Sequence, residues 1–104
     1  MSVVLLNVSI NLLPEEKSGK YGPVFPGTGC SIQFHDNQTW HCLQEFADRE
    51  FAYPGEQCRA SIRFLEPGIQ PESLYKGKDF KLLEGAKQIG SGIILEVHLI
   101  DEWA

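Results

Sequence analysis

Five thiol and imidazole side chains are the residues in this sequence most suited to chemistry. Thiolates and imidazoles are the ligands that zinc prefers, and a cysteine beside a histidine base can serve as a nucleophile. The five residues are Cys30, His35, His41, Cys42 and Cys58. The cysteines form an odd set without Cys-x-x-Cys spacing, which argues against a disulfide framework and favours a reducing compartment. We therefore expect a cytoplasmic protein.

Strand periodicity separates the candidate metal ligands. Cys30 alternates in step with the apolar residues Ile32 and Phe34, whereas His35 has the opposite parity. Successive side chains of a strand leave opposite faces, so Cys30 and His35 should not ligate one ion. The pattern therefore predicts no metal site.

The adjacent residues His41 and Cys42 are a poor catalytic pair for the same reason. Neighbouring strand residues point apart, and no asparagine or aspartate signature marks a third catalytic group. Cys58 shares the parity of Ala60 and Ile62, which predicts a small core residue. We predict a protein without catalytic residues and without a cofactor.

The Gly-Ser-Gly run at residues 90–92 lies close to Lys87 but does not predict a phosphate-binding loop. Such loops have their own glycine spacing and lead into a helix, whereas the Ile-Ile-Leu at residues 93–95 continues as a strand. Gly90 and Gly92 instead predict a β-bulge or the close approach of another backbone.

Alternating apolar and polar residues predict that most of the chain is strand. Turn signals, among them Tyr-Pro-Gly-Glu at residues 53–56, separate the alternating runs. Only residues 71–75 could form a short helical turn. The expected strands are residues 4–12, 30–34, 39–43, 58–64, 80–83 and 88–99. This pattern predicts an all-β fold, a small closed antiparallel barrel or a sandwich.

The chain length indicates how many domains to expect, and the net charge indicates which classes of partner to expect. A chain of 104 residues with 42% hydrophobic residues is expected to form a single domain over residues 1–104. The formal net charge of -5 repels phosphate backbones, so we expect no DNA partner and only local contact with RNA. The N-terminal segment lacks a basic region and carries alternating polar residues, so it predicts neither a signal peptide nor a membrane span.

The order of the motifs resembles the C-terminal β-barrel, the third domain, of translation elongation factor Tu and its relatives. Residues 18–23 and 29–34 are similar to a family segment with a basic loop followed by GYRPQFYF. Residues 53–56 are similar to the family's MPGD. Residues 80–94 are similar to FxIREGGRTVGAGVV, and they keep the phenylalanine, Glu-Gly and both later glycines.

This resemblance implies a Greek-key barrel, and we expect it to act here as a stand-alone domain, without the family's GTPase. In the family, the barrel helps to hold the T-stem of aminoacyl-tRNA around the Glu-Gly turn, which corresponds to Glu84 and Gly85, with Lys87 at a basic position. Cys30-Ser31 stands where the family has arginine and proline, and Leu83 replaces the arginine before Glu-Gly. Phosphate affinity depends on such charges, so the departures weigh against tRNA.

We expect a binding module that engages a protein partner, which could be one linked to translation, with tRNA binding as the alternative. The candidate macromolecule-binding residues are Lys20, Tyr21, Glu84, Gly85 and Lys87. Aromatic side chains could anchor such an interface or serve in the barrel core. The aromatic candidates are Tyr21, Trp40, Tyr75 and Trp103.

Overall fold

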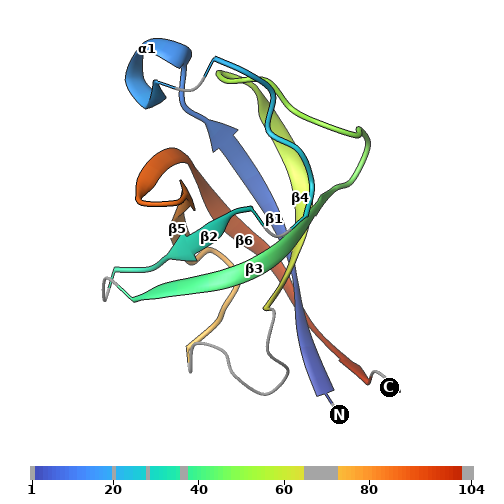
Figure 1. The fold of residues 1–104 in the computed structure, drawn as a ribbon. Coiled ribbons are helices and arrows are strands. Elements are labelled where there is room, and N and C mark those ends of the chain that lie inside the picture. Colours follow the sequence, from blue (N-terminus) through green and yellow to red (C-terminus); the bar gives the residue numbers. More distant parts are fainter. Residues whose placement is uncertain (1, 20, 28, 36–37, 65–72, 102–104) are drawn as a thin grey trace.

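The computed structural model describes residues 2–19, 21–27, 29–35, 38–64 and 73–101. These residues form one short helix and six strands, which Figure 1 colours along the chain. The elements are β1 (Ser2–Leu12), α1 (Glu15–Ser18), β2 (Ser31–Gln33), β3 (Thr39–Phe46), β4 (Gln57–Phe64), β5 (Asp79–Glu84) and β6 (Lys87–Asp101).

The strands form a closed barrel in the order β1-β4-β3-β2-β5-β6, and every neighbouring pair is antiparallel. β2, β3 and β4 lie side by side in sequence order, and β1 lies beside β4, which is a Greek-key arrangement. This confirms the predicted all-β barrel. The part of the chain that the structure describes contains no helix with the length and hydrophobicity to cross a lipid bilayer.

Alternation along β1 supplies one wall of the core. Its even-numbered residues from Val4 to Leu12 are buried, while the odd-numbered residues between them are half-buried or exposed. The other strands and two loops contribute buried apolar residues in the same way. These are Val24, Cys30, Ile32, Phe34, Cys42, Ala52, Cys58, Ala60, Ile62, Phe64, Phe80, Leu82, Ile89 and Ile94. The predicted burial of Cys30 and Cys58 is thus confirmed.

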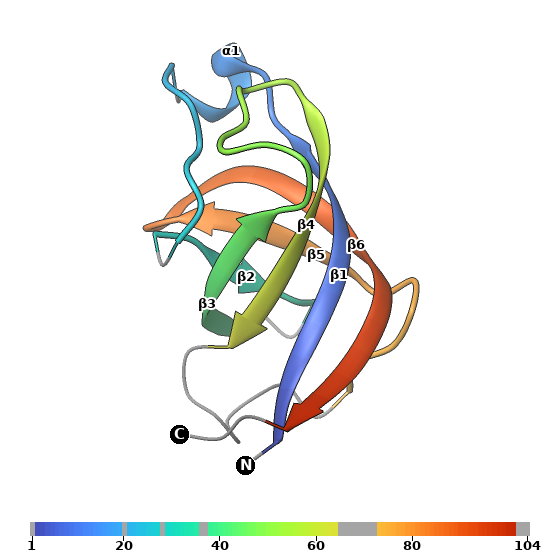
Figure 2. The same ribbon diagram turned by 90° about the vertical axis from the view of Figure 1, so that its right-hand side faces the viewer.

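β1 and β6 form a long two-stranded ribbon that extends past the rest of the barrel. They pair from Ser2 and Asp101 to Leu12 and Gly90, with one register shift between Asn7 and Val8. β4 joins β1 only from Leu5 onward, and β5 pairs with β6 only as far as Ile93. The beginning of β1 and the end of β6 therefore continue together at the lower end, near both termini (Figure 2).

Close packing of β1, β5 and β6 explains the two glycines of the Gly-Ser-Gly run. A Cβ on Gly90 would lie 2.8 Å from the backbone oxygen of Asn11, and one on Gly92 would lie 2.8 Å from that of Ser9. Real side chains do not approach so closely, so both positions need glycine. This confirms the predicted close approach of another backbone.

The turns follow the local sequence closely. Gly55 adopts φ 88°, and Tyr53 C=O accepts a hydrogen bond from Glu56 N–H at 3.1 Å, as a type II turn requires, so the turn predicted at residues 53–56 is confirmed. α1 forms one turn between the first two expected strands, where no helix was predicted, because Pro14 precedes it and Gly19, with φ 73°, ends it. The predicted helical turn at residues 71–75 lies partly outside the described residues, and residues 73–75 are not helical.

Gln44 is a fully buried polar side chain of β3. Its Nε2 donates to Cys30 Sγ at 3.2 Å, but its Oε1 finds no hydrogen-bond partner in the described structure. An unpaired buried acceptor costs about 1–3 kcal/mol.

Gln44→Met keeps a similar volume without the amide, so we expect the free energy of unfolding in urea to rise by about 1 kcal/mol. Gln44→Glu, which buries a charge in the same space, should lower it. A Gln44→Met protein less stable than wild type would contradict this account.

Candidate functional site

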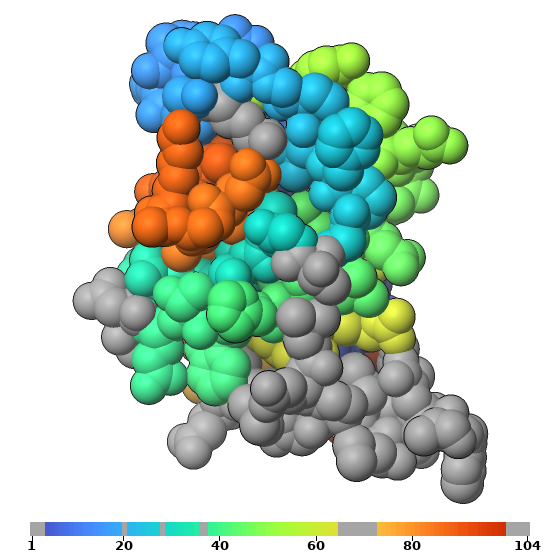
Figure 3. Space-filling view, viewed as in Figure 1, coloured from blue at the N-terminus to red at the C-terminus, as the bar shows by residue number. Residues whose placement is uncertain are grey.

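Loops and one hairpin turn gather at the end of the barrel away from the termini (Figure 1). The contributing segments are the connection from β1 to β2, which carries α1, the connection from β3 to β4, and the turn between β5 and β6. Gly55 N–H donates to Leu13 C=O at 3.2 Å and so joins the two connections, and Leu13 N–H donates to Ile89 C=O at 2.8 Å and so joins the β1–β2 connection to β6. Figure 3 shows the blue-to-cyan, orange and yellow-green segments meeting on one surface.

An antiparallel β-bridge joins the β1–β2 connection to the β3–β4 connection. This bridge determines which side chains of the two connections face water. Val24 N–H donates to Ala52 C=O at 2.7 Å, and Ala52 N–H donates to Val24 C=O at 3.0 Å. Val24 and Ala52 are buried. Since neighbouring side chains of an extended segment point to opposite faces, Phe25 and Phe51 must point outward, directly opposite each other across the bridge.

The outward side chains Phe25, Phe51 and Tyr53 form what we call the aromatic cluster. The ring centroids of Phe25 and Phe51 are 5.8 Å apart, and those of Phe51 and Tyr53 are 5.4 Å apart with an interplanar angle of 85°. These are favourable separations for aromatic pairs. The rings nevertheless remain in water, with exposed fractions of 63% for Phe25 and 52% for Tyr53.

Polar contacts hold one side of the aromatic cluster in place. Tyr53 N–H donates to Glu56 Oε1 at 2.7 Å, and the other carboxylate oxygen of Glu56 accepts from the Arg49 guanidinium at 3.3 Å. Arg49 also donates to Asp48 at 3.1 Å. An apolar centre with an ordered polar rim is the arrangement found in protein interfaces.

Three of the predicted binding residues share the β5–β6 turn beside the Gly19 segment. Gly85 adopts φ 63° in this tight turn, and Glu84 and Lys87 pair across it. Lys87 Nζ lies 2.7 Å from the position that a Cβ on Gly19 would occupy. The Lys87 side chain therefore lies against Gly19, in the connection that also carries Tyr21.

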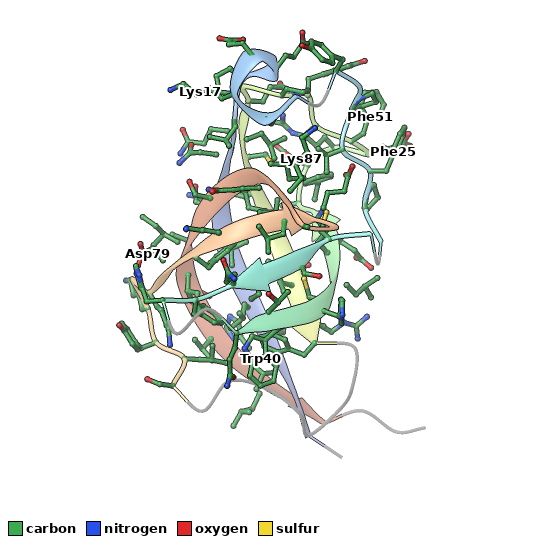
Figure 4. All side chains as sticks on the ribbon, turned by 60° about the vertical axis from the view of Figure 1, so that its left-hand side comes forward. Lys17, Phe25, Trp40, Phe51, Asp79 and Lys87 are labelled. Atoms are coloured by element: carbon green, nitrogen blue, oxygen red, sulfur yellow. The ribbon has the colours of Figure 1, made fainter. Side chains whose placement is uncertain are left out.

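Figure 4 shows how this turn relates to the aromatic cluster. Lys87 lies at the same end of the molecule, between Lys17 of α1 and the pair Phe25 and Phe51. Tyr21, a predicted binding residue, is 73% exposed on the connection that also carries Phe25. The remaining predicted residue, Lys20, lies outside the described residues.

Two of the other predicted aromatic anchors, Trp40 and Tyr75, do not join this surface. Trp40 is half-buried and packs edge-on against Phe64, with ring centroids 6.1 Å apart, so it belongs to the core. Tyr75 is exposed but lies before β5, with the Lys78 ammonium 5.5 Å from its ring. Trp103 lies outside the described residues.

The thiols are placed for packing rather than reaction. All three cysteines are buried, and Cys42 Sγ donates to Cys30 C=O at 3.6 Å. Burial, together with the neighbouring Cys30 thiol, raises the pKa of Cys42 to about 12. Burial also raises the pKa of Cys58. Nucleophilic attack needs the thiolate, which these groups do not form near neutral pH.

The histidines beside the cysteines face water. His41 is exposed, and its Nδ1 lies 3.0 Å from Ser31 Oγ on β2, whereas Cys42 points inward. His35 Nε2 donates to Asp79 Oδ1 at 2.9 Å, and both of these side chains are exposed, whereas Cys30 is buried. The opposite directions that strand parity predicted for both pairs are confirmed. No cluster of three or more potential metal ligands occurs within the described ranges.

The sequence interpretation missed Phe25 and Phe51. The sequence does carry a local signal for them. Each is an aromatic residue next to a small or β-branched residue, in a segment that is rich in proline and glycine and lies outside any strongly alternating run. The bridge from Val24 to Ala52, which makes the two rings neighbours, cannot be predicted from a local pattern. Comparison of the sequence with models of known protein families finds no family that matches.

Proposed function

We propose that this protein is a non-catalytic cytoplasmic module that binds a protein partner through the aromatic cluster and the adjoining Lys87 turn. The observation that supports this is the exposure of Phe25, Phe51 and Tyr53 as a packed group. Aromatic side chains bring a large contact area at little conformational cost, and they supply much of the binding energy at protein interfaces.

The charge around the aromatic cluster favours a partner with a basic rim. Asp48, Glu50 and Glu56 outnumber Arg49 on the connection that carries Phe51 and Tyr53, and the whole chain carries a formal charge of -5. Opposite charge on the partner would speed encounter and orient it. Together with the motif resemblance to the third domain of elongation factor Tu, this suggests a protein partner linked to translation.

A non-catalytic role is supported by the state of the reactive groups. Cys42 is buried and protonated, and His41 leaves the opposite face of β3. A cysteine and its base need hydrogen-bond reach to act together. The exposed aromatic rings of the cluster pack against one another, which suits recognition.

We expect Phe25→Ala/Phe51→Ala to lose the partner while the barrel stays folded. Phe25 is 63% and Phe51 37% exposed, and neither belongs to the buried core, so their removal should lower the melting temperature only modestly, whereas loss of two central aromatic anchors should weaken binding at least about 30-fold. The measurement is quantitative affinity capture from a bacterial lysate on immobilised wild type and variant, followed by titration of the recovered protein. Tyr75→Ala removes an exposed ring from another part of the surface and is the matched control. Equal binding to wild type and the double variant would refute this function.

The second candidate function is tRNA binding, favoured by the arrangement of the β5–β6 turn. The Lys87 ammonium lies beside Gly19, at the end of the molecule that also carries Lys17 of α1, so cations from two distant segments share this end. Phosphate contacts weaken steeply with salt. Retardation of labelled tRNA at low salt that Lys87→Glu abolishes, and Phe25→Ala/Phe51→Ala does not, would favour this candidate over protein binding.

A further inference from the structure

The lower half of β6 has a backbone edge without a strand partner among the described residues. β5 pairs with β6 only as far as Ile93, and Ile94 makes the last two hydrogen bonds, with Lys78 and Gly77. From Leu95 to Asp101, β6 pairs on one side with β1 alone (Figure 2). Alternate N–H and C=O groups of this stretch point to the open edge, which makes it a template for another strand.

The same stretch carries apolar side chains that face the core side of the sheet but remain in water. Val97 lies opposite Leu6, and Leu99 lies opposite Val4, and both of these β1 residues are buried. Residues directly opposite on antiparallel strands point to the same face. Leu99 is nevertheless 76% exposed. Long edges with exposed apolar residues are normally covered, because they otherwise cause aggregation.

The outer face of this stretch carries one acid and one base, two residues apart. Glu96 Oε2 accepts from His98 Nε2 at 2.8 Å, and both lie within reach of the Asn7 side chain on β1. In a two-fold antiparallel pair centred on Val97, Glu96 would lie opposite the partner subunit's His98, and His98 opposite the partner subunit's Glu96. The edge is therefore complementary in charge to its own copy.

We propose that the chain forms a two-fold symmetric dimer by antiparallel pairing of the Leu95–Asp101 stretch of β6 with its copy, in the register that places Val97 against the partner's Val97. The pairing satisfies the open backbone groups and joins the two sheets edge to edge. It shields the Val97 and Leu99 side chains from water. The aromatic cluster lies at the other end of the barrel, so the dimer would present two copies of it. The dimer proposal therefore does not rest on the proposed function.

Charge reversal tests the register. Each of two reversed variants should dimerise poorly by itself, whereas a mixture of the two should dimerise well. In Glu96→Lys both cross-strand acid–base pairs are lost, and in His98→Glu two carboxylates oppose each other. A mixed dimer restores opposite charges, since the new lysine of one chain would face the new glutamate of the other, and the unchanged His98 would face the unchanged Glu96. We expect each variant alone to dissociate roughly tenfold more readily than wild type, and the mixture to recover the wild-type affinity.

The measurement is sedimentation equilibrium over a range of concentrations, with wild type expected near twice the chain mass of 11.7 kDa. Lys81→Glu, a reversal at an exposed residue of β5, is the matched control and should dimerise as wild type does. Amide exchange at residues 95–101 should slow as concentration rises. A monomeric wild type, a dimer that neither reversal weakens, or a mixture no tighter than its components would each overturn the proposal.

Discussion

Gly92→Ala is expected to destabilise the barrel by about 3 kcal/mol, at the upper end of the usual range for an overpacked core. Gly92 lies between Ile10 of β1 and Phe80 of β5. The new Cβ would overlap the Phe80 ring, and it would lie 2.8 Å from the backbone oxygen of Ser9. The ring cannot move aside freely because it is buried and packs edge-on against Phe34, with centroids 6.3 Å apart.

Urea unfolding distinguishes this clash from a general effect of alanine in β6. The variants to compare are Gly92→Ala, Ser91→Ala and Gly92→Ala/Phe80→Leu. Ser91 is half-buried between the two glycines, so its replacement should cost less than about 1 kcal/mol. Phe80→Leu removes the atoms that the new methyl group meets. The double variant should therefore be more stable than the sum of its single changes predicts. Additive single effects, or a Gly92→Ala protein as stable as wild type, would show that the close approach is not what requires glycine.

Raising the pH above 9 is expected to unfold the protein, with ionisation of Cys42 as a main cause. The pKa of Cys42 is raised in the folded state from 9.0 to about 12, mainly by burial. A pKa that is higher in the folded state favours folding fully below the unfolded value, and this contribution is lost as pH rises from about 9 to about 12. Over that interval the loss amounts to about 4 kcal/mol, a large part of the stability of a small domain.

The test compares the pH dependence of stability in wild type and Cys42→Ala between about pH 8 and about pH 12, the range that brackets both pKa values. The variant starts from a lower stability because it leaves a cavity, but its free energy of unfolding should fall less steeply with pH. A thiol reagent should leave Cys42 of the folded wild type unmodified at about pH 8 and modify it rapidly in urea. His41→Ala, on the exposed neighbour, should reproduce the wild-type slope. Equal slopes for wild type and Cys42→Ala would remove this thiol as the cause.

Most of the barrel could be predicted from the chain alone, because strand alternation is a local property. The parity of Val4, Leu6 and Val8 already assigned the inner face of β1, and the parity of Cys58 and Phe64 did the same for β4. Opposite parity also separated His41 from Cys42. α1 was not predicted, since a single turn between Pro14 and Gly19 is too short to show a helical period.

The candidate surfaces depend on contacts between segments far apart in the chain. Alternation shows that a residue faces outward, but it does not show which other outward residue becomes its neighbour. Phe25 and Phe51 meet only because the closed barrel brings Val24 within hydrogen-bonding distance of Ala52. The open edge of β6 arises likewise, because β5 stops pairing at Ile93 while β6 runs on to Asp101. The local alternation of side chains thus specifies the core. Barrel closure and unequal strand lengths determine where aromatic rings and backbone hydrogen-bonding groups remain exposed and able to bind a partner.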